Sequence, residues 1–99
     1  MIAVITSEFN KEIVNGLLDG CKKSLKGHDL DIIKVPGAFE LPSTAQQCVD
    51  SNKYLAVITL GCVIKGETDH YDYICQAVSI GVMNVSIESN IPILFGVLT

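Results

Sequence analysis

The segment 61–72, which reads GCVIKGETDHYD, holds the residues of this 99-residue chain that are best suited to chemistry. Gly66 gives the backbone freedom just before an expected helix, so that the amides of Glu67 and Thr68 can face an anion at the helix N-terminus. His70 follows within one turn, and an imidazole exchanges protons near neutral pH. The pattern predicts an anion site beside a proton donor, and a histidine that is merely solvated is the alternative.

Two earlier segments carry residues that a plain connection does not require. Phe9, in the segment Ser7–Asn10, can stack on a flat heterocycle or can pack against the helix that follows. In the segment 35–42, which reads VPGAFELP, two prolines and a glycine make a rigid turn that presents Glu40. The Glu40 carboxylate can accept hydrogen bonds from the hydroxyls of a sugar or polyol, or it can simply favour the positive end of the next helix.

The three segments can form one site only if the fold brings them close together. Short apolar runs rich in β-branched residues predict four strands, at Ile2–Thr6, Leu30–Val35, Leu55–Leu60 and Ile93–Leu98. The first, third and fourth runs are nearly continuous, which is typical of strands buried on both faces of a parallel sheet. Apolar residues at helical spacing predict helices from Asn10 to about Lys26, after Pro42, and from about Tyr71 to Ser89. Asn10 is expected to cap the first of these helices.

This order of elements predicts an α/β fold with three layers, α/β/α, around a four-stranded parallel sheet. Ligands of such sheets bind beyond the carboxyl ends of the strands. The segments 7–10, 35–42 and 61–72 all follow strands directly, so we expect them to meet at that edge.

The third predicted helix carries two apolar lines. One comprises Tyr71, Ile74, Cys75, Val78, Val82 and Val85, and the other comprises Tyr73, Ile80, Met83 and Ile87. The second line lies on the opposite side of the helix from the first, and a surface helix needs only one apolar face. We therefore expect the same helix of neighbouring subunits to cover it about a rotation axis. Cover by further helices of the same chain is the alternative.

Composition limits the class of protein. The net charge of −4 leaves no basic face for nucleic acid. Charged residues interrupt every apolar run before it reaches the roughly 18 residues of a membrane span. Met1 leads directly into an apolar run without a basic leader, so we expect no membrane association and a cytoplasmic protein. The four cysteines are widely spaced, which predicts reduced, buried thiols and no metal site.

Four blocks of the chain resemble the signature blocks of the lumazine synthase family, in the family's order and at its spacing. They are Phe9-Asn10, residues 35–42, residues 66–72 and Phe95–Thr99, and the similarity covers essentially the whole chain. The resemblance implies a flavodoxin-like single domain over residues 1–99 and a transferase activity without a cofactor. The implied reaction condenses 5-amino-6-(D-ribitylamino)uracil with 3,4-dihydroxy-2-butanone 4-phosphate to give 6,7-dimethyl-8-ribityllumazine, the penultimate step of riboflavin biosynthesis.

The resemblance also implies roles for individual residues. Positions that contact the uracil substrate in the family match Phe9, Asn10, Ala38, Phe39, Glu40, Cys62, Val63, Ile64 and Phe95. Phe9 matches the aromatic that stacks on the pyrimidinedione ring, and the segment 38–40 matches the part that holds the ribityl chain. Glu67 and Thr68 match the backbone site for the phosphate of the second substrate. His70 matches the proton donor.

The chain also departs from the family's pattern. Cys62 stands where many members have threonine, and Lys65 stands where arginine is frequent. The family's phosphate-binding arginine, and an acidic residue that supports the histidine, lie beyond Thr99, so we expect this domain and its site to be C-terminally incomplete. The partners that the resemblance implies are the two small-molecule substrates, further copies of the chain in a pentamer or an icosahedral assembly of pentamers, and riboflavin synthase.

Other proteins on a similar scaffold are less compatible with these residues. A receiver domain requires an acidic pair after the first strand, and a flavodoxin requires a Gly/Thr-rich phosphate loop there. Ser7-Glu8-Phe9-Asn10 is neither. A non-catalytic, shell-forming or flavin-binding protein on the same scaffold is the alternative from another class, but His70 close after Gly66 favours the enzyme.

Overall fold

Strand β1 (Ile2–Ser7) is buried along its whole length, because it lies inside a sheet that is covered on both faces. The protein is described by a computed structural model over residues 1–66 and 69–99. The other strands are β2 (Leu30–Val35), β3 (Ala56–Cys62) and β4 (Ile93–Leu98), and all pairs run parallel in the order β2-β1-β3-β4. The predicted parallel α/β sheet is therefore confirmed.

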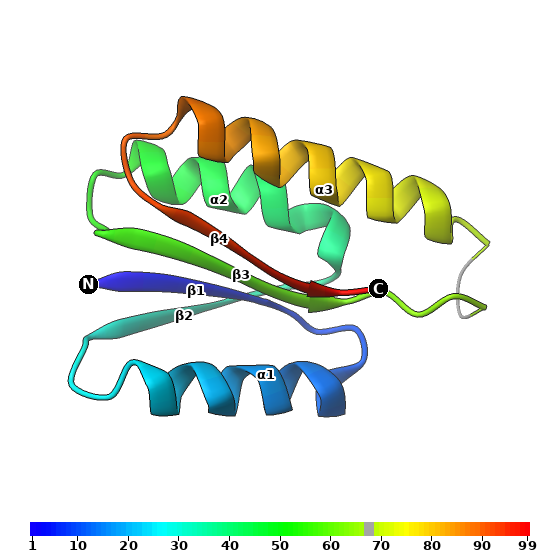
Figure 1. Ribbon diagram of the computed structural model, residues 1–99, viewed down its shortest axis with the longest axis horizontal. Coiled ribbons are helices and arrows are strands. Elements are labelled where there is room, and N and C mark those ends of the chain that lie inside the picture. The colour runs from blue at the N-terminus through cyan, green and yellow to red at the C-terminus, as the bar shows by residue number, and fades with distance from the viewer. Residues whose placement is uncertain (67–68) are drawn as a thin grey trace.

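Helices lie on both sides of this sheet, as the sequence predicts (Figure 1). Helix α1 (Lys11–Ser24) covers one face, and α2 (Leu41–Asp50) and α3 (Tyr71–Glu88) cover the other. A short 3-10 helix that the sequence analysis did not predict, η1 (Ala38–Glu40), leads directly into α2. All four strands point the same way, so the loops after β1, β2 and β3 emerge at one edge.

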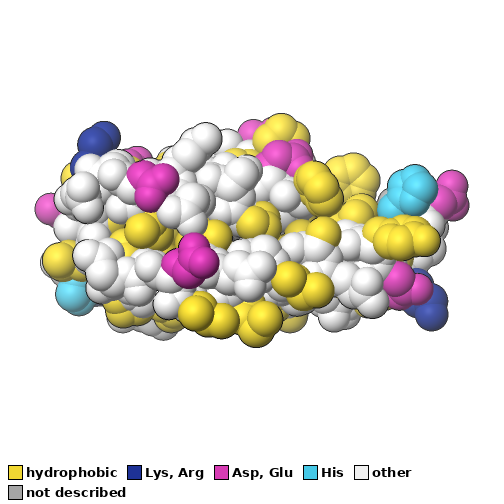
Figure 2. Space-filling view, turned by 90° about the horizontal axis from the view of Figure 1, so that it is seen from above, with side chains coloured by type: hydrophobic (Ala, Val, Ile, Leu, Met, Phe, Trp, Pro, Cys, Tyr) yellow, Lys and Arg dark blue, Asp and Glu magenta, His cyan; other side chains and the backbone are white. Residues whose placement is uncertain are grey.

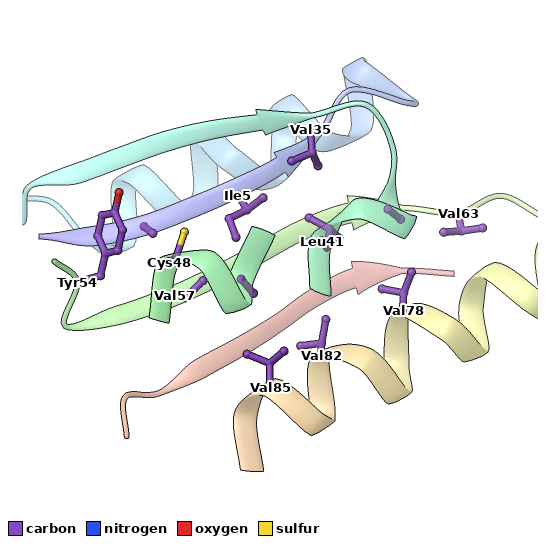
Figure 3. Packing of buried hydrophobic residues seen from close by; sticks show 13 residues of the cluster. Ile5, Val35, Leu41, Cys48, Tyr54, Val57, Val63, Val78, Val82 and Val85 are labelled. Carbon is purple, nitrogen blue, oxygen red and sulfur yellow. The ribbon is translucent and has the colours of Figure 1, made fainter. Parts of the chain in front are cut away.

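The main core lies between the sheet and the helices α2 and α3. Figure 3 shows Ile5 of β1 beside Leu41 at the start of α2 and Val57 of β3 beside Cys48 further along that helix, while Val78 and Val82 extend inward from α3. A smaller cluster on the other face contains Ile2, Val4 and Leu60 and packs against the apolar side of α1. The stripe predicted for α3 is therefore its buried side.

Strand β4 is less buried than the sequence predicts. A continuous apolar run is typical of a strand covered on both faces, but Leu94, Phe95 and Leu98 are each about half exposed. The reason lies in the sheet order, because β4 is the edge strand beyond β3, while α1 packs against β1 and β3. Hydrophobicity along a strand cannot distinguish an edge from the centre.

Details at the ends of elements also differ from the predictions. The third strand starts at Ala56 and continues through Gly61 and Cys62, which pair with Val97 and Leu98 of β4. Asn10 occupies the N-cap position of α1, but its side chain makes no capping hydrogen bond. The backbone of Asn10 is left-handed, and its side-chain amide points to another partner, described below.

None of the four cysteines, all of which lie in the described part of the chain, forms a disulfide; Cys48 and Cys62 are buried, as predicted, whereas Cys21 and Cys75 are only partly buried. Burial raises the pKa of the Cys21 and Cys48 thiols, which keeps these groups protonated and unreactive at neutral pH. Among the described helices, none combines the length and the apolar character that crossing a membrane requires.

Candidate functional site

A cavity of about 250 Å³ opens at the edge of the sheet where the strands end. Its walls come from the loops after β1, β2 and β3 and from the first turn of α3. The lining residues are Phe9, Gly37, Ala38, Phe39, Glu40, Cys62, Val63, Ile64 and Ile74. Glu40 supplies a carboxylate to a wall that otherwise consists of apolar side chains and backbone. Such a cavity suits a flat ring joined to a polar chain.

Hydrogen bonds join the loops that form this cavity. The backbone N–H of Glu8 donates to the carbonyl of Val35 at 2.9 Å, which links the loop after β1 to the end of β2. The side-chain amide of Asn10 donates to the carbonyl of Cys62 at 3.3 Å, which links the same loop to the end of β3. These bonds hold the cavity walls in place before any ligand arrives.

The segment 37–40 reaches the sheet closely because β3 carries a glycine there. A methyl group on Gly61 would lie 3.2 Å from Leu41 Cδ1 and 3.7 Å from Ala38 Cβ. With Ala38 and Leu41 buried against the sheet, Phe39 points outward and is 64% exposed. Phe9 is 56% exposed on the neighbouring loop. Both rings therefore have faces available to a ligand.

His70 lies at the N-cap position of α3 and is exposed. Its backbone carbonyl accepts a hydrogen bond from the N–H of Ile74 at 2.9 Å, and Ile74 lines the cavity one turn further on. The imidazole ring also neighbours the ring of Tyr73, with centroids 6.4 Å apart. Gly66 has a φ of 97°, as expected from its role in freeing the backbone before this helix. Glu67 and Thr68, predicted to face an anion, lie outside the described residues.

Phe95 lies away from the other residues assigned to the uracil substrate. It contributes to a separate groove of about 210 Å³ between α3 and β4, together with Val82, Met83, Ile87 and Ile93. Within one chain, the structure thus brings together Phe9 and the segments 38–40 and 62–64, but it does not bring Phe95 to the same cavity.

Two residues of the cavity wall, Gly37 and Ile74, were not among the predicted site residues. Gly37 belongs to the rigid turn that presents Glu40, so the turn itself was the available signal. Ile74 was assigned only to the stripe that faces the sheet. Its place one turn after His70, at the end of α3 that borders the cavity, is the feature that could have identified it.

Comparison with protein families agrees with this geometry. A family model described as 6,7-dimethyl-8-ribityllumazine synthase matches residues 1–99. The match includes every loop that lines the cavity, and it confirms the resemblance carried by the four sequence blocks. The parallel α/β fold, the cavity at the carboxyl edge of the sheet and the match over the whole chain lead to one conclusion: the protein belongs to the 6,7-dimethyl-8-ribityllumazine synthase family, whose enzymes are transferases of riboflavin biosynthesis.

Proposed function

We propose that the protein condenses 5-amino-6-(D-ribitylamino)uracil with 3,4-dihydroxy-2-butanone 4-phosphate to give 6,7-dimethyl-8-ribityllumazine. One observation carries this proposal: residues expected at the uracil site from three separate loops line a single cavity. The exposed ring of Phe9 offers a stacking surface for the pyrimidinedione. The carboxylate of Glu40 can accept charge-assisted hydrogen bonds from the ribityl hydroxyls.

The chemistry needs few protein groups. The uracil's amine attacks the ketone of the four-carbon phosphate, and loss of water gives an imine. Elimination then releases inorganic phosphate, and the second amine closes the ring with loss of another water. Since the amine is already a nucleophile, holding both substrates in position supplies much of the rate enhancement. His70 is the proposed proton donor and acceptor, and its place at the start of α3 puts it on the element that borders the cavity.

An absorbance assay tests this proposal directly. The full-length protein is mixed with both substrates, and formation of the lumazine is followed against the reaction without protein. We expect a rate well above this background. A protein that binds flavin or the ribitylaminouracil but forms no lumazine faster than the background reaction would instead be the non-catalytic member of the scaffold.

We also propose that the chain works as a homo-oligomer, in a pentamer or an assembly of pentamers. The support is the outer side of α3, where Tyr73, Ile80, Met83 and Ile87 are all exposed. Figure 2 looks onto the face formed by α2 and α3 and shows hydrophobic side chains spread over it, with lysines only at its two ends. A soluble protein normally covers an apolar surface of this kind. Phe95, half exposed in the adjoining groove, is then in reach of a neighbouring copy rather than of its own cavity.

A further inference from the structure

We propose that Asn10 is a positioning residue that fixes the stacking ring of Phe9 by tying its loop to the end of β3. The proposal rests on the proposed function, in which Phe9 binds the uracil ring. It also changes the role expected for Asn10 from the sequence, which was contact with the substrate.

The backbone at Asn10 restricts which residue can stand there. Its φ of 59° and ψ of 54° are left-handed, a conformation that glycine and asparagine adopt far more readily than other residues. This turn of the chain is what lets α1 begin at Lys11 directly after the loop. Glycine would satisfy this requirement equally well, so the backbone alone does not explain an asparagine.

The side chain supplies the second requirement. The Asn10 Nδ2 group donates to the carbonyl of Cys62 at 3.3 Å, across a separation of 52 positions in the chain. Cys62 is the last residue of β3 and lines the cavity. The amide is not used to cap α1, although asparagine is among the best capping residues. Its hydrogen bond therefore joins two walls of the cavity instead of stabilising the helix end.

Phe9 lies between two residues that each form a hydrogen bond to a neighbouring strand. On one side the N–H of Glu8 bonds to the carbonyl of Val35, and on the other side the amide of Asn10 bonds to the carbonyl of Cys62. Because the Phe9 ring is more than half exposed, packing alone does not fix it. Its position depends on the loop backbone, and the Asn10 bond holds the end of that loop nearest the helix. A ring fixed in advance loses less entropy when it stacks on a ligand.

The chain contains a matched control for this residue. Asn52 has the same φ of 59°, is exposed, and lies in the turn between α2 and β3, at the opposite edge of the sheet. Asn10→Gly and Asn52→Gly both keep a residue suited to the left-handed backbone. Only Asn10→Gly removes a hydrogen bond between two cavity walls. Asn10→Asp is the second variant, because its carboxylate keeps the size of the side chain but cannot donate.

Calorimetry on the full-length protein measures affinity for each substrate separately. Loss of one hydrogen bond of ordinary strength should weaken binding of 5-amino-6-(D-ribitylamino)uracil by roughly 3- to 10-fold in both Asn10→Gly and Asn10→Asp. Affinity for 3,4-dihydroxy-2-butanone 4-phosphate should stay at the parent value, as should both affinities in Asn52→Gly. An affinity for the uracil substrate in Asn10→Gly equal to that of the parent overturns the proposal. An equal loss of affinity for both substrates also overturns it, because it indicates that the whole site is less ordered.

A second measurement separates this proposal from the proposed function. Relaxation of the backbone ¹⁵N nuclei, without any ligand, reports the order of the loop at Phe9. We expect this order to fall in Asn10→Gly and Asn10→Asp and to be unchanged in Asn52→Gly. If the parent protein does not bind the uracil, the proposed function fails while this test still decides the role of Asn10. Unchanged order at Phe9 in both Asn10 variants contradicts that role.

Discussion

Gly81 of α3 lies against the ring of Pro42 in the first turn of α2, so closely that a methyl group on Gly81 would lie 2.7 Å from Pro42 Cγ. The proline ring is rigid and cannot turn away, so the two helices would have to separate. Gly81→Ala should therefore lower the free energy of unfolding by about 1–3 kcal/mol, in spite of the better helix propensity of alanine. Denaturant unfolding measures this change.

Gly20 of α1 is the control for this substitution. It lies inside a helix and is exposed, and an added methyl group would meet no atom within 4 Å among the described residues outside its own stretch of helix. Gly20→Ala should raise the free energy of unfolding by about 0.5–1 kcal/mol, since only the propensity changes. Equal effects at the two positions would show that the contact with Pro42 is unimportant.

Tyr54 and Asp31 predict a dependence of stability on alkaline pH. The Tyr54 hydroxyl donates to Asp31 Oδ2 at 2.5 Å, and this bond, with burial and the Asp31 charge, raises the pKa of Tyr54 from 10.0 to about 12. The bond requires the protonated phenol. Its contribution to the free energy of unfolding is therefore complete below pH 10 and is lost as the pH rises from 10 to about 12.

Tyr54→Phe should lower the free energy of unfolding by about 1.5–3 kcal/mol at neutral pH and should flatten its decline between pH 10 and 12. Tyr73→Phe, which removes a tyrosine hydroxyl that is exposed in the single chain, is the control and should leave the decline between pH 10 and 12 as steep as in the parent. Denaturant midpoints measured across this pH range test the prediction. If the free energy of unfolding declines equally steeply in Tyr54→Phe, the decline is due to other titrating groups.

His70 is expected to transfer protons and not to bind substrate. His70→Ala should lower turnover by roughly 10²- to 10⁴-fold while leaving substrate affinity nearly intact, with the low end favoured because the attacking amine is already nucleophilic. Steady-state turnover together with calorimetric affinities separates the two effects. Turnover at the parent rate in the full-length variant would exclude this role.

Phe9 is expected to stack on the uracil ring. Phe9→Ala should weaken binding of the ribitylaminouracil, whereas Phe9→Tyr and Phe9→Trp should largely preserve it, because stacking requires only an aromatic face. Calorimetry gives the affinities, and a stacked pair is worth about 0.5–1.5 kcal/mol beyond the buried area. Equal affinity in the alanine variant would leave Phe9 only a role in starting α1.

The outer side of α3 is expected to form the subunit interface. Ile80 and Ile87 are 53% and 72% exposed in the single chain, so introduced charges do not disturb its core. The double variant Ile80→Glu and Ile87→Glu should break the assembly by placing charges in an apolar interface, and helix content should remain. Size-exclusion chromatography and circular dichroism check both statements. A full-length double variant that elutes at the parent size contradicts this interface.

Residue patterns along the chain were sufficient to predict the α/β class, the β2 and β4 bounds, the buried side of α3 and the three segments that meet at the cavity. The reason is that spacing of apolar residues reports which side of an element is buried, and parallel strands bring their carboxyl ends to one edge. Loop position and residue type indicated Phe9 and Glu40, the family blocks assigned their roles, and both residues line that cavity.

Contacts between distant residues could not be predicted in this way. The strand order places β4 at the edge of the sheet, with Phe95 in a groove separate from the cavity. The residues of β4 alone do not indicate which strand lies beside it. Asn10 shows the same limit, because its sequence context predicts a helix cap, while its amide bonds to Cys62, 52 positions away. Local sequence limits the conformations of a residue, whereas its hydrogen-bond partner depends on which groups the folded chain brings within reach.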